Sequence, residues 1–123
     1  TVEEVVHNLQ AKMNVIIDAR ASDRFHGQNE TLDPVGGHIP NAINYCFREN
    51  LSRKSFKAPE QLYKDFVGLL GSTKPSEVIH QCGSGVTACH NLLAMEIAGF
   101  KGSRLYAGSW SEWCADPSRP VAL

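Results

Sequence analysis

Short apolar runs alternate along the chain with longer segments in which apolar side chains recur every three or four residues. The runs are brief and rich in Val and Ile, which is typical of strands buried on both faces. We expect strands near residues 15–17, 42–44, 78–79 and 105–106. Helical spacing is found over residues 2–10, 59–70 and 88–98. This alternation indicates βαβ units, and therefore an α/β fold with a central, mostly parallel sheet and helices on both faces.

Residues suited to helix ends support these assignments. Thr1 can cap the first helix. Pro59 lies in the first turn of the second helix, where its missing N–H costs nothing. Gly71 and Gly99 follow the second and third helices, as glycine often does at a C-terminus. A last helical turn is expected over residues 109–113.

Chemically active side chains follow two of the expected strands. Asp18 and Arg20 come at the end of the first strand, with Arg24 a few residues later, and Cys82 follows the third strand. Ligands of parallel sheets bind beyond the carboxyl ends of the strands. We therefore expect these side chains to gather at one edge of the sheet.

Composition narrows the class of protein. The 123 residues, 42% of them apolar, suit one globular domain over residues 1–123. A formal net charge of −1 without a Lys/Arg run argues against binding to nucleic acid or an anionic membrane. No apolar run approaches the roughly 20 residues of a membrane span, and no signal peptide is evident, so we expect a cytoplasmic protein. The four cysteines form no CxxC pair, which favours free thiols over disulfides or a metal site.

The segment after the third strand has the composition of a thiolate-stabilising loop. Gly83 and Gly85 allow backbone N–H groups to turn toward Cys82, and the following helix adds partial positive charge. Ser84 and Thr87 can add hydroxyl donors. Because the thiolate is the reactive form of cysteine, we interpret Cys82 as a nucleophile rather than a packed thiol.

The surroundings of Cys82 limit the chemistry of this nucleophile. A cysteine phosphatase needs an arginine six residues later to grip phosphate, and that position is Ala88. Acyl transfer would need a histidine base, for which His80 is the nearby candidate, although a packed strand residue is the simpler interpretation. Backbone donors without a fixed cation suit a cysteine that carries one additional sulfur.

Four motifs in order along the chain resemble those of rhodanese domains. They are residues 15–20 (VIIDAR), 37–40 (GHIP), 82–88 (CGSGVTA) and 108–113 (GSWSEW). The CGSGVT loop is similar to that of the C-terminal catalytic domains of 3-mercaptopyruvate sulfurtransferases. Thiosulfate-using rhodaneses typically carry basic residues at the second and sixth loop positions, which here are Gly83 and Thr87.

The resemblance implies a function for this loop. Cys82 would take the sulfur of 3-mercaptopyruvate, release pyruvate, and pass the persulfide sulfur to thioredoxin, another thiol or cyanide. Arg24 would hold the carboxylate of this small-molecule donor, and Ser84 would relay a proton. The substrate-binding residues implied are Arg24, Gly83, Gly85, Val86 and Thr87. No cofactor or metal is implied.

The resemblance also assigns supporting roles, and the sequence departs from the family pattern at several positions, one of which concerns carboxylate binding. Asp18, Arg20 and His38 would brace the loops around the site. The family usually has a second arginine before the GHIP motif, but residues 28–36 contain none. Carboxylate binding is therefore expected to be weaker or supplied by other groups.

Tandem domains are the usual context of such a sequence. The resemblance implies an N-terminal rhodanese domain as a partner, with this chain as the C-terminal half of the pair. Two alternatives stay open: a thiosulfate sulfurtransferase, and a rhodanese module for sulfur relay or protein binding with little turnover.

Overall fold

The structure is a computed structural model that describes residues 1–52, 55–83 and 85–123. Its elements are α1 (Val2–Ala11), β1 (Val15–Asp18), α2 (Ser22–Phe25), β2 (Ile43–Asn44), the 3₁₀ helix η1 (Phe47–Asn50), β3 (Leu51–Ser52), β4 (Ser55–Phe56), α3 (Pro59–Leu70), the 3₁₀ helix η2 (Pro75–Glu77), β5 (Val78–Gln81), α4 (Ala88–Ile97), β6 (Arg104–Leu105) and α5 (Ser109–Trp113). The three long helices predicted from the sequence are present, each with ends within one residue of those expected. The cap of α1 also forms, with the Glu4 N–H donating to Thr1 Oγ1.

The central sheet is parallel, as predicted. Its strand order is β2-β1-β5-β6, and every neighbouring pair is parallel. β1 and β5 are in register from the pair Val15 and Val78 to the pair Asp18 and Gln81. Both strands therefore end at the same edge of the sheet, and Cys82 lies one residue beyond it.

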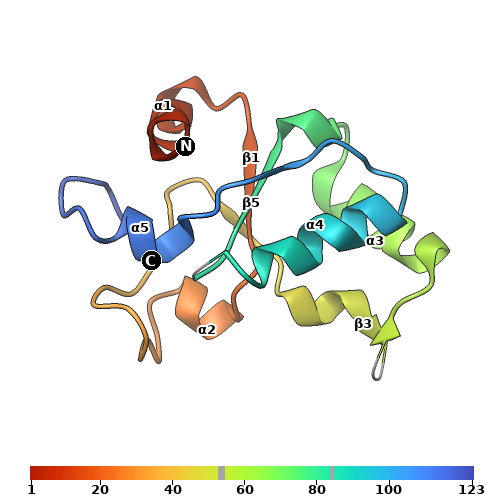
Figure 1. Cartoon of the computed structure of the whole chain (residues 1–123), viewed down its shortest axis with the longest axis horizontal. Helices are drawn as coiled ribbons and strands as arrows, with labels where there is room; N and C mark the ends of the chain where they lie inside the picture. The colour runs from red at the N-terminus through yellow and green to blue at the C-terminus, as the bar shows by residue number, and fades with distance from the viewer. Residues whose placement is uncertain (53–54, 84) are drawn as a thin grey trace.

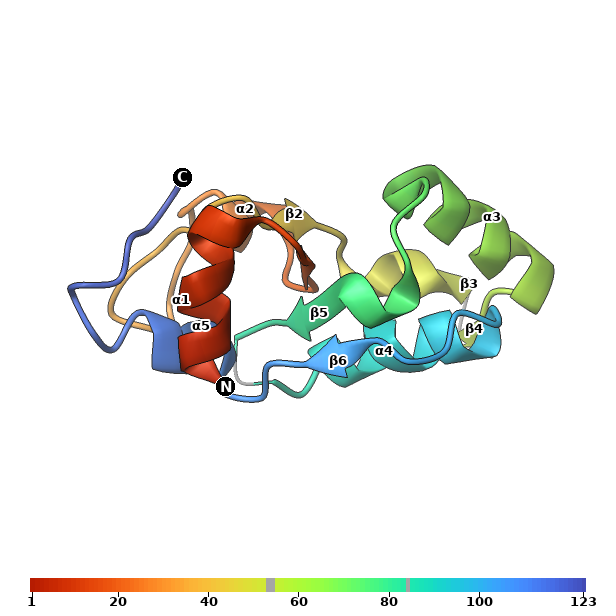
Figure 2. The ribbon, with the colours of Figure 1, turned by 90° about the horizontal axis from the view of Figure 1, so that it is seen from above.

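Helices cover both faces of this sheet. Alternate side chains of β1 and β5 point to opposite faces, so that Ile16 and Ile79 enter one core while Ile17 and Val78 enter the other. The first core is completed from α1 and α5, the second from α3 and α4. Figures 1 and 2 show α1 and α5 toward one end of the molecule and α3 and α4 toward the other.

The C-terminal segment packs on the loop that precedes β2. His38 and Ala122 form an isolated antiparallel bridge, with N–H to O distances of 2.8 and 2.9 Å. The Trp113 indole N–H donates to the Pro120 carbonyl at 2.9 Å. A Cβ on Gly37 would lie 2.5 Å from the Ala122 carbonyl oxygen, so glycine is needed where the two segments cross.

Several short elements differ from the sequence-based expectation. β6 covers residues 104–105, one residue earlier than predicted, because its pairing with β5 selects that register. α2 and the antiparallel pair β3 and β4 were not predicted, since elements of two to four residues leave no periodic pattern. Among the residues that the structure describes, no helix combines the length and apolar character needed to cross a bilayer.

Candidate active site

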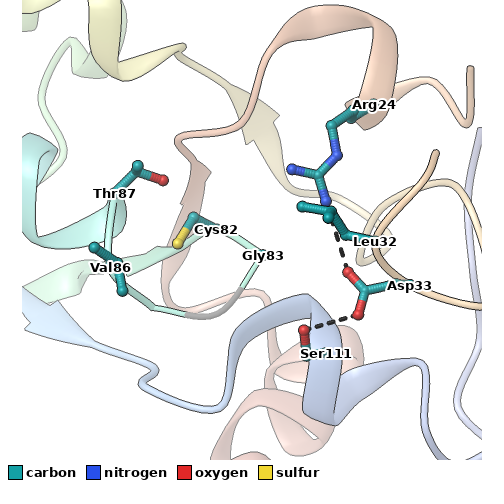
Figure 3. A pocket seen from close by; sticks show the side chains of 8 residues that line it. All are labelled: Arg24, Leu32, Asp33, Cys82, Gly83, Val86, Thr87 and Ser111. Carbon is teal, nitrogen blue, oxygen red and sulfur yellow. Dashed lines mark hydrogen bonds and ion pairs between the residues drawn. The ribbon is translucent and has the colours of Figure 1, made fainter. Parts of the chain in front are cut away.

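A pocket of about 280 Å³ opens beyond the carboxyl ends of β1 and β5. Figure 3 shows the residues that line it: Arg24, Leu32, Asp33, Cys82, Gly83, Val86, Thr87 and Ser111. Five of the predicted site residues are therefore in one cavity: Arg24, Cys82, Gly83, Val86 and Thr87. The apolar residues Leu32 and Val86 are 77% and 73% exposed and form part of the rim.

Cys82 is buried at the base of the loop and its sulfur accepts a backbone hydrogen bond. The Gly85 N–H donates to Cys82 Sγ at 3.0 Å. Gly85 has a φ of +96°, and a Cβ there would lie 2.5 Å from the Ala107 carbonyl oxygen. Glycine is thus required at the position whose N–H points at the sulfur.

The start of α5 holds the Cys82 loop in place. The buried Ser109 accepts from the Cys82 N–H at 3.0 Å and donates to the Tyr106 carbonyl at 2.9 Å. The Trp110 and Ser111 N–H groups donate to the carbonyls of Cys82 and Gly83, each at 2.9 Å. Sequence reasoning did not find the role of Ser109. The GSWSEW motif, to which Ser109 belongs, indicated that the segment matters but not that Ser109 contacts Cys82.

Arg24 lies across the pocket from the cysteine loop. A Cβ on Gly83 would lie 3.5 Å from Nη2 of Arg24, so the guanidinium faces the loop residue next to Cys82. The same Nη2 lies 3.2 Å from Oε2 of Glu30 and 3.6 Å from Oδ2 of Asp33. Ser111 donates to the other oxygen of Asp33 at 2.8 Å, a contact drawn in Figure 3. Neither Asp33 nor Ser111 was among the predicted site residues.

These contacts continue a chain of ion pairs that starts inside the protein. Buried Asp18 accepts from Arg20, with Nη2 to Oδ2 at 2.8 Å, and Arg20 Nη1 lies 3.7 Å from Glu30. We call Asp18, Arg20, Glu30, Arg24 and Asp33 the ion-pair chain. It places three carboxylates against two guanidinium groups, so negative charges outnumber positive charges within this chain of ion pairs.

Glu30 is ionised within this chain. Burial by itself would raise the pKa of Glu30, but N–H donation from Leu32 and Asp33 and the neighbouring Arg24 guanidinium together lower it below its usual value. Glu30 accepts these N–H groups at 3.0 and 3.2 Å, which ties the pocket loop to its carboxylate. The carboxylate therefore fixes both the loop and the arginine.

The three residues expected to support the site lie behind it. Asp18 and Arg20 do not line the pocket, and Arg20 also donates to the Gly37 carbonyl at 2.7 Å. His38 Nδ1 lies 2.7 Å from the Phe25 carbonyl oxygen, and its ring stacks on Phe25 at a centroid distance of 3.7 Å. Ser84, the expected proton relay, lies outside the described residues.

Comparison with known proteins agrees with this architecture. A family model described as a rhodanese-like domain matches residues 1–116. The chain belongs to the rhodanese-like family. This rhodanese-like domain is 53% identical over 119 residues to a probable 3-mercaptopyruvate sulfurtransferase of Pseudomonas aeruginosa, covering 93% of the chain and 42% of the relative. It is 39% identical over 118 residues to a mouse thiosulfate sulfurtransferase, covering 92% of the chain and 39% of the relative.

A solved structure gives the same picture. The rhodanese-like domain superimposes on 3-mercaptopyruvate sulfurtransferase from Leishmania major with a TM-score of 0.74 and 31% identity, covering 87% of this chain and 31% of the other. The chain thus spans about four-tenths of the length of the curated relatives named above.

His80 does not take part in the pocket of the rhodanese-like domain. It is fully buried in β5, with Nε2 3.2 Å from Ser103 Oγ, and it does not line the cavity. Burial lowers the pKa of His80 to about 4, so its ring is neutral near pH 7. The interpretation of His80 as a packed strand residue therefore fits the structure better than a role as a base for Cys82.

The geometry of the rhodanese-like domain supports nucleophilic chemistry at sulfur. A buried thiol faces a cavity, a backbone N–H is aimed at its Sγ, and a guanidinium lies across the pocket from the loop. Among the described residues that line the pocket, Arg24 carries the one positive charge. This set of groups can stabilise a sulfur anion and orient a small ligand that carries one carboxylate.

Proposed function

We propose that this domain transfers sulfane sulfur from 3-mercaptopyruvate through a persulfide on Cys82. Relatives named 3-mercaptopyruvate sulfurtransferase and thiosulfate sulfurtransferase support the class of reaction. The observation that carries the proposal is the 3.0 Å hydrogen bond from the Gly85 N–H to the Sγ of Cys82, a residue that lines the pocket. A backbone donor aimed at this atom favours the anionic form of the thiol, which is the attacking nucleophile.

The proposed reaction has two balanced steps. The Cys82 thiolate attacks the thiol sulfur of the donor, the carbon–sulfur bond breaks, and its electron pair forms the enolate of pyruvate. The enolate takes up a proton and leaves as pyruvate, while Cys82 retains the sulfur as a persulfide. An acceptor thiolate, such as that of thioredoxin, or cyanide then attacks the outer sulfur and regenerates the Cys82 thiolate.

The pocket residues receive the following roles in this proposal. Arg24 binds the donor carboxylate, because a guanidinium pairs with a carboxylate through two parallel N–H donors. Gly83, Val86 and Thr87 border the donor, and Gly85 donates to the sulfur. The proton needed by the enolate is assigned to Ser84 by resemblance alone. An N-terminal rhodanese domain would supply further relay groups in the whole protein.

Thiosulfate is the second candidate donor, because a relative with 39% identity is named thiosulfate sulfurtransferase. A dianion needs more positive charge than a monocarboxylate. The loop positions that are basic in thiosulfate-using rhodaneses are Gly83 and Thr87 here, and Arg24 is already paired with Glu30 and Asp33. These features favour the monoanionic donor.

Intact-mass spectrometry tests the proposal directly. Incubation with 3-mercaptopyruvate should add one sulfur atom to the chain and release pyruvate, and Cys82→Ser should abolish both. Cys89→Ser is the matched control, since Cys89 does not line the pocket and a serine hydroxyl can replace its thiol as the donor to the Gly85 carbonyl, and it should behave as the unmodified chain. Absence of an adduct with 3-mercaptopyruvate would reject the proposal, and an adduct with thiosulfate alone would favour the second candidate.

A further inference from the structure

Arg24 is the group to which an anionic donor would bind, yet it is paired on the pocket side by an acidic residue. Asp33 lines the pocket, its side chain is about 10% exposed, and its Oδ2 lies 3.6 Å from Arg24 Nη2. Ser111 holds the other oxygen of Asp33 at 2.8 Å. A negative charge is thus fixed at the place where the donor's negative charge must arrive (Figure 3).

The two acidic partners of Arg24 differ in how firmly they are attached. Glu30 is hydrogen-bonded to two backbone N–H groups and to Arg24, and it does not line the pocket. Asp33 has the longer contact with Arg24 and faces the cavity. An incoming carboxylate can therefore compete with Asp33 for the guanidinium, whereas Glu30 stays in place as part of the loop.

We propose that Asp33 is a specificity-determining residue: its carboxylate competes with the sulfur donor for Arg24 and selects against donors of higher negative charge. This inference rests on the proposed function for the identity of the donors. The electrostatic energy between Asp33 and a bound donor is proportional to the donor's charge. The repulsive energy between Asp33 and a dianion is therefore about twice that between Asp33 and a monoanion. Asp33 thus discriminates between donors by their charge.

Steady-state kinetics of Asp33→Asn test the specificity. We expect KM for 3-mercaptopyruvate to fall about tenfold, and KM for thiosulfate about a hundredfold, because doubling the charge squares the factor. The kcat values should change less than twofold, since Asp33 does not touch the reacting sulfur. Asp33→Glu, which retains the charge, should keep the original preference.

Asp65→Asn is the matched control for net charge. Asp65 pairs with Lys57 at 3.2 Å and does not line the pocket, so its substitution should leave both KM values unchanged. Thermal unfolding of all variants checks that they are folded. KM values that stay the same or rise for both donors in folded Asp33→Asn would overturn the proposal.

A second measurement does not depend on turnover. Iodoacetate and iodoacetamide alkylate thiols with the same geometry but differ by one negative charge. The alkylation of Cys82 is followed by peptide mass spectrometry. We expect the ratio of the iodoacetate rate to the iodoacetamide rate to rise about tenfold in Asp33→Asn and to stay constant in Asp65→Asn. If no donor forms a persulfide, the proposed function fails while this ratio still tests Asp33. An unchanged ratio would show that the Asp33 charge does not act on ligands of the pocket.

Discussion

Gly85→Ala should damage the cysteine loop in two separable ways. The positive φ of +96° costs an L side chain about 1–2 kcal/mol. The new Cβ would also lie 2.5 Å from the Ala107 carbonyl oxygen, and such overpacking costs about 1–3 kcal/mol more. We therefore expect the free energy of unfolding to fall by about 3 kcal/mol.

The same substitution should slow persulfide formation beyond its effect on stability. We expect relief of the contact with Ala107 to move the Gly85 N–H away from Cys82 Sγ, and a hydrogen bond to a charged group contributes about 1.5–3 kcal/mol. This corresponds to a rate about 10- to 100-fold lower, which rapid-quench mass spectrometry with 3-mercaptopyruvate can measure under conditions where the variant is folded.

Gly99→Ala is the control for backbone strain. Gly99 has a φ of +98° at the end of α4, and no heavy atom of the described residues lies within 4 Å of the position of its Cβ, its chain neighbours aside. In Gly99→Ala, the free energy of unfolding in urea should fall by about 1–2 kcal/mol, and the rate of persulfide formation should not change. If Gly85→Ala and Gly99→Ala lost the same stability and Gly85→Ala kept its rate, neither the close approach nor the hydrogen bond would have the importance assigned here.

The charge of the cysteine loop, the contact of Ser109 with Cys82 and the burial of His80 can each be tested by substitution. The double variant Gly83→Arg, Thr87→Arg should gain persulfide formation from thiosulfate, because it adds two positive charges next to Arg24; an unchanged ratio of adduct formed from the two donors would show that loop charge does not set the preference. Ser109→Ala should lower the free energy of unfolding in urea by about 1–3 kcal/mol, because it leaves the buried Cys82 N–H without its acceptor, and a loss below about 0.5 kcal/mol would argue against this role. Burial lowers the pKa of His80 from 6.5 to about 4, so the unfolded chain binds a proton in that range that the folded chain does not, and stability should fall by about 2 kcal/mol between pH 7 and pH 5. His80→Gln should make that part of the pH dependence disappear in urea unfolding at the two pH values, and an unaltered pH dependence would contradict the assignment.

The fold could be predicted from the sequence where an element is long or strongly apolar. Helical spacing located α3 to the residue, and the Val/Ile runs located β1 and β5. α2 and the β3 and β4 pair escaped prediction because they are too short for a period to show. β6 was displaced by one residue, since pairing with β5 rather than its own composition sets its ends.

Only some of the residues that line the pocket could be predicted from the sequence. Cys82 and its loop follow one strand directly, so the local sequence identified them, whereas Arg24 was assigned by resemblance to rhodanese domains. Asp33 lies in an aperiodic loop and meets Ser111, 78 positions later, through a single hydrogen bond. Nothing in the local pattern of either residue indicates that contact. The acidic surroundings of Arg24 therefore could not be predicted from the sequence, because they depend on how distant segments pack together.

The bridge between His38 and Ala122 shows that residues beyond the family match pack on the domain. The family match stops at residue 116, but residues 120–122 hold Trp113 and the loop around Gly37, from which Arg20 also receives its carbonyl partner. A protein truncated at the family boundary would lose the strand-like edge that fixes this loop. Residues 120–122, which lie beyond the family match, therefore help to hold the loop around Gly37, and expression of the domain should retain them.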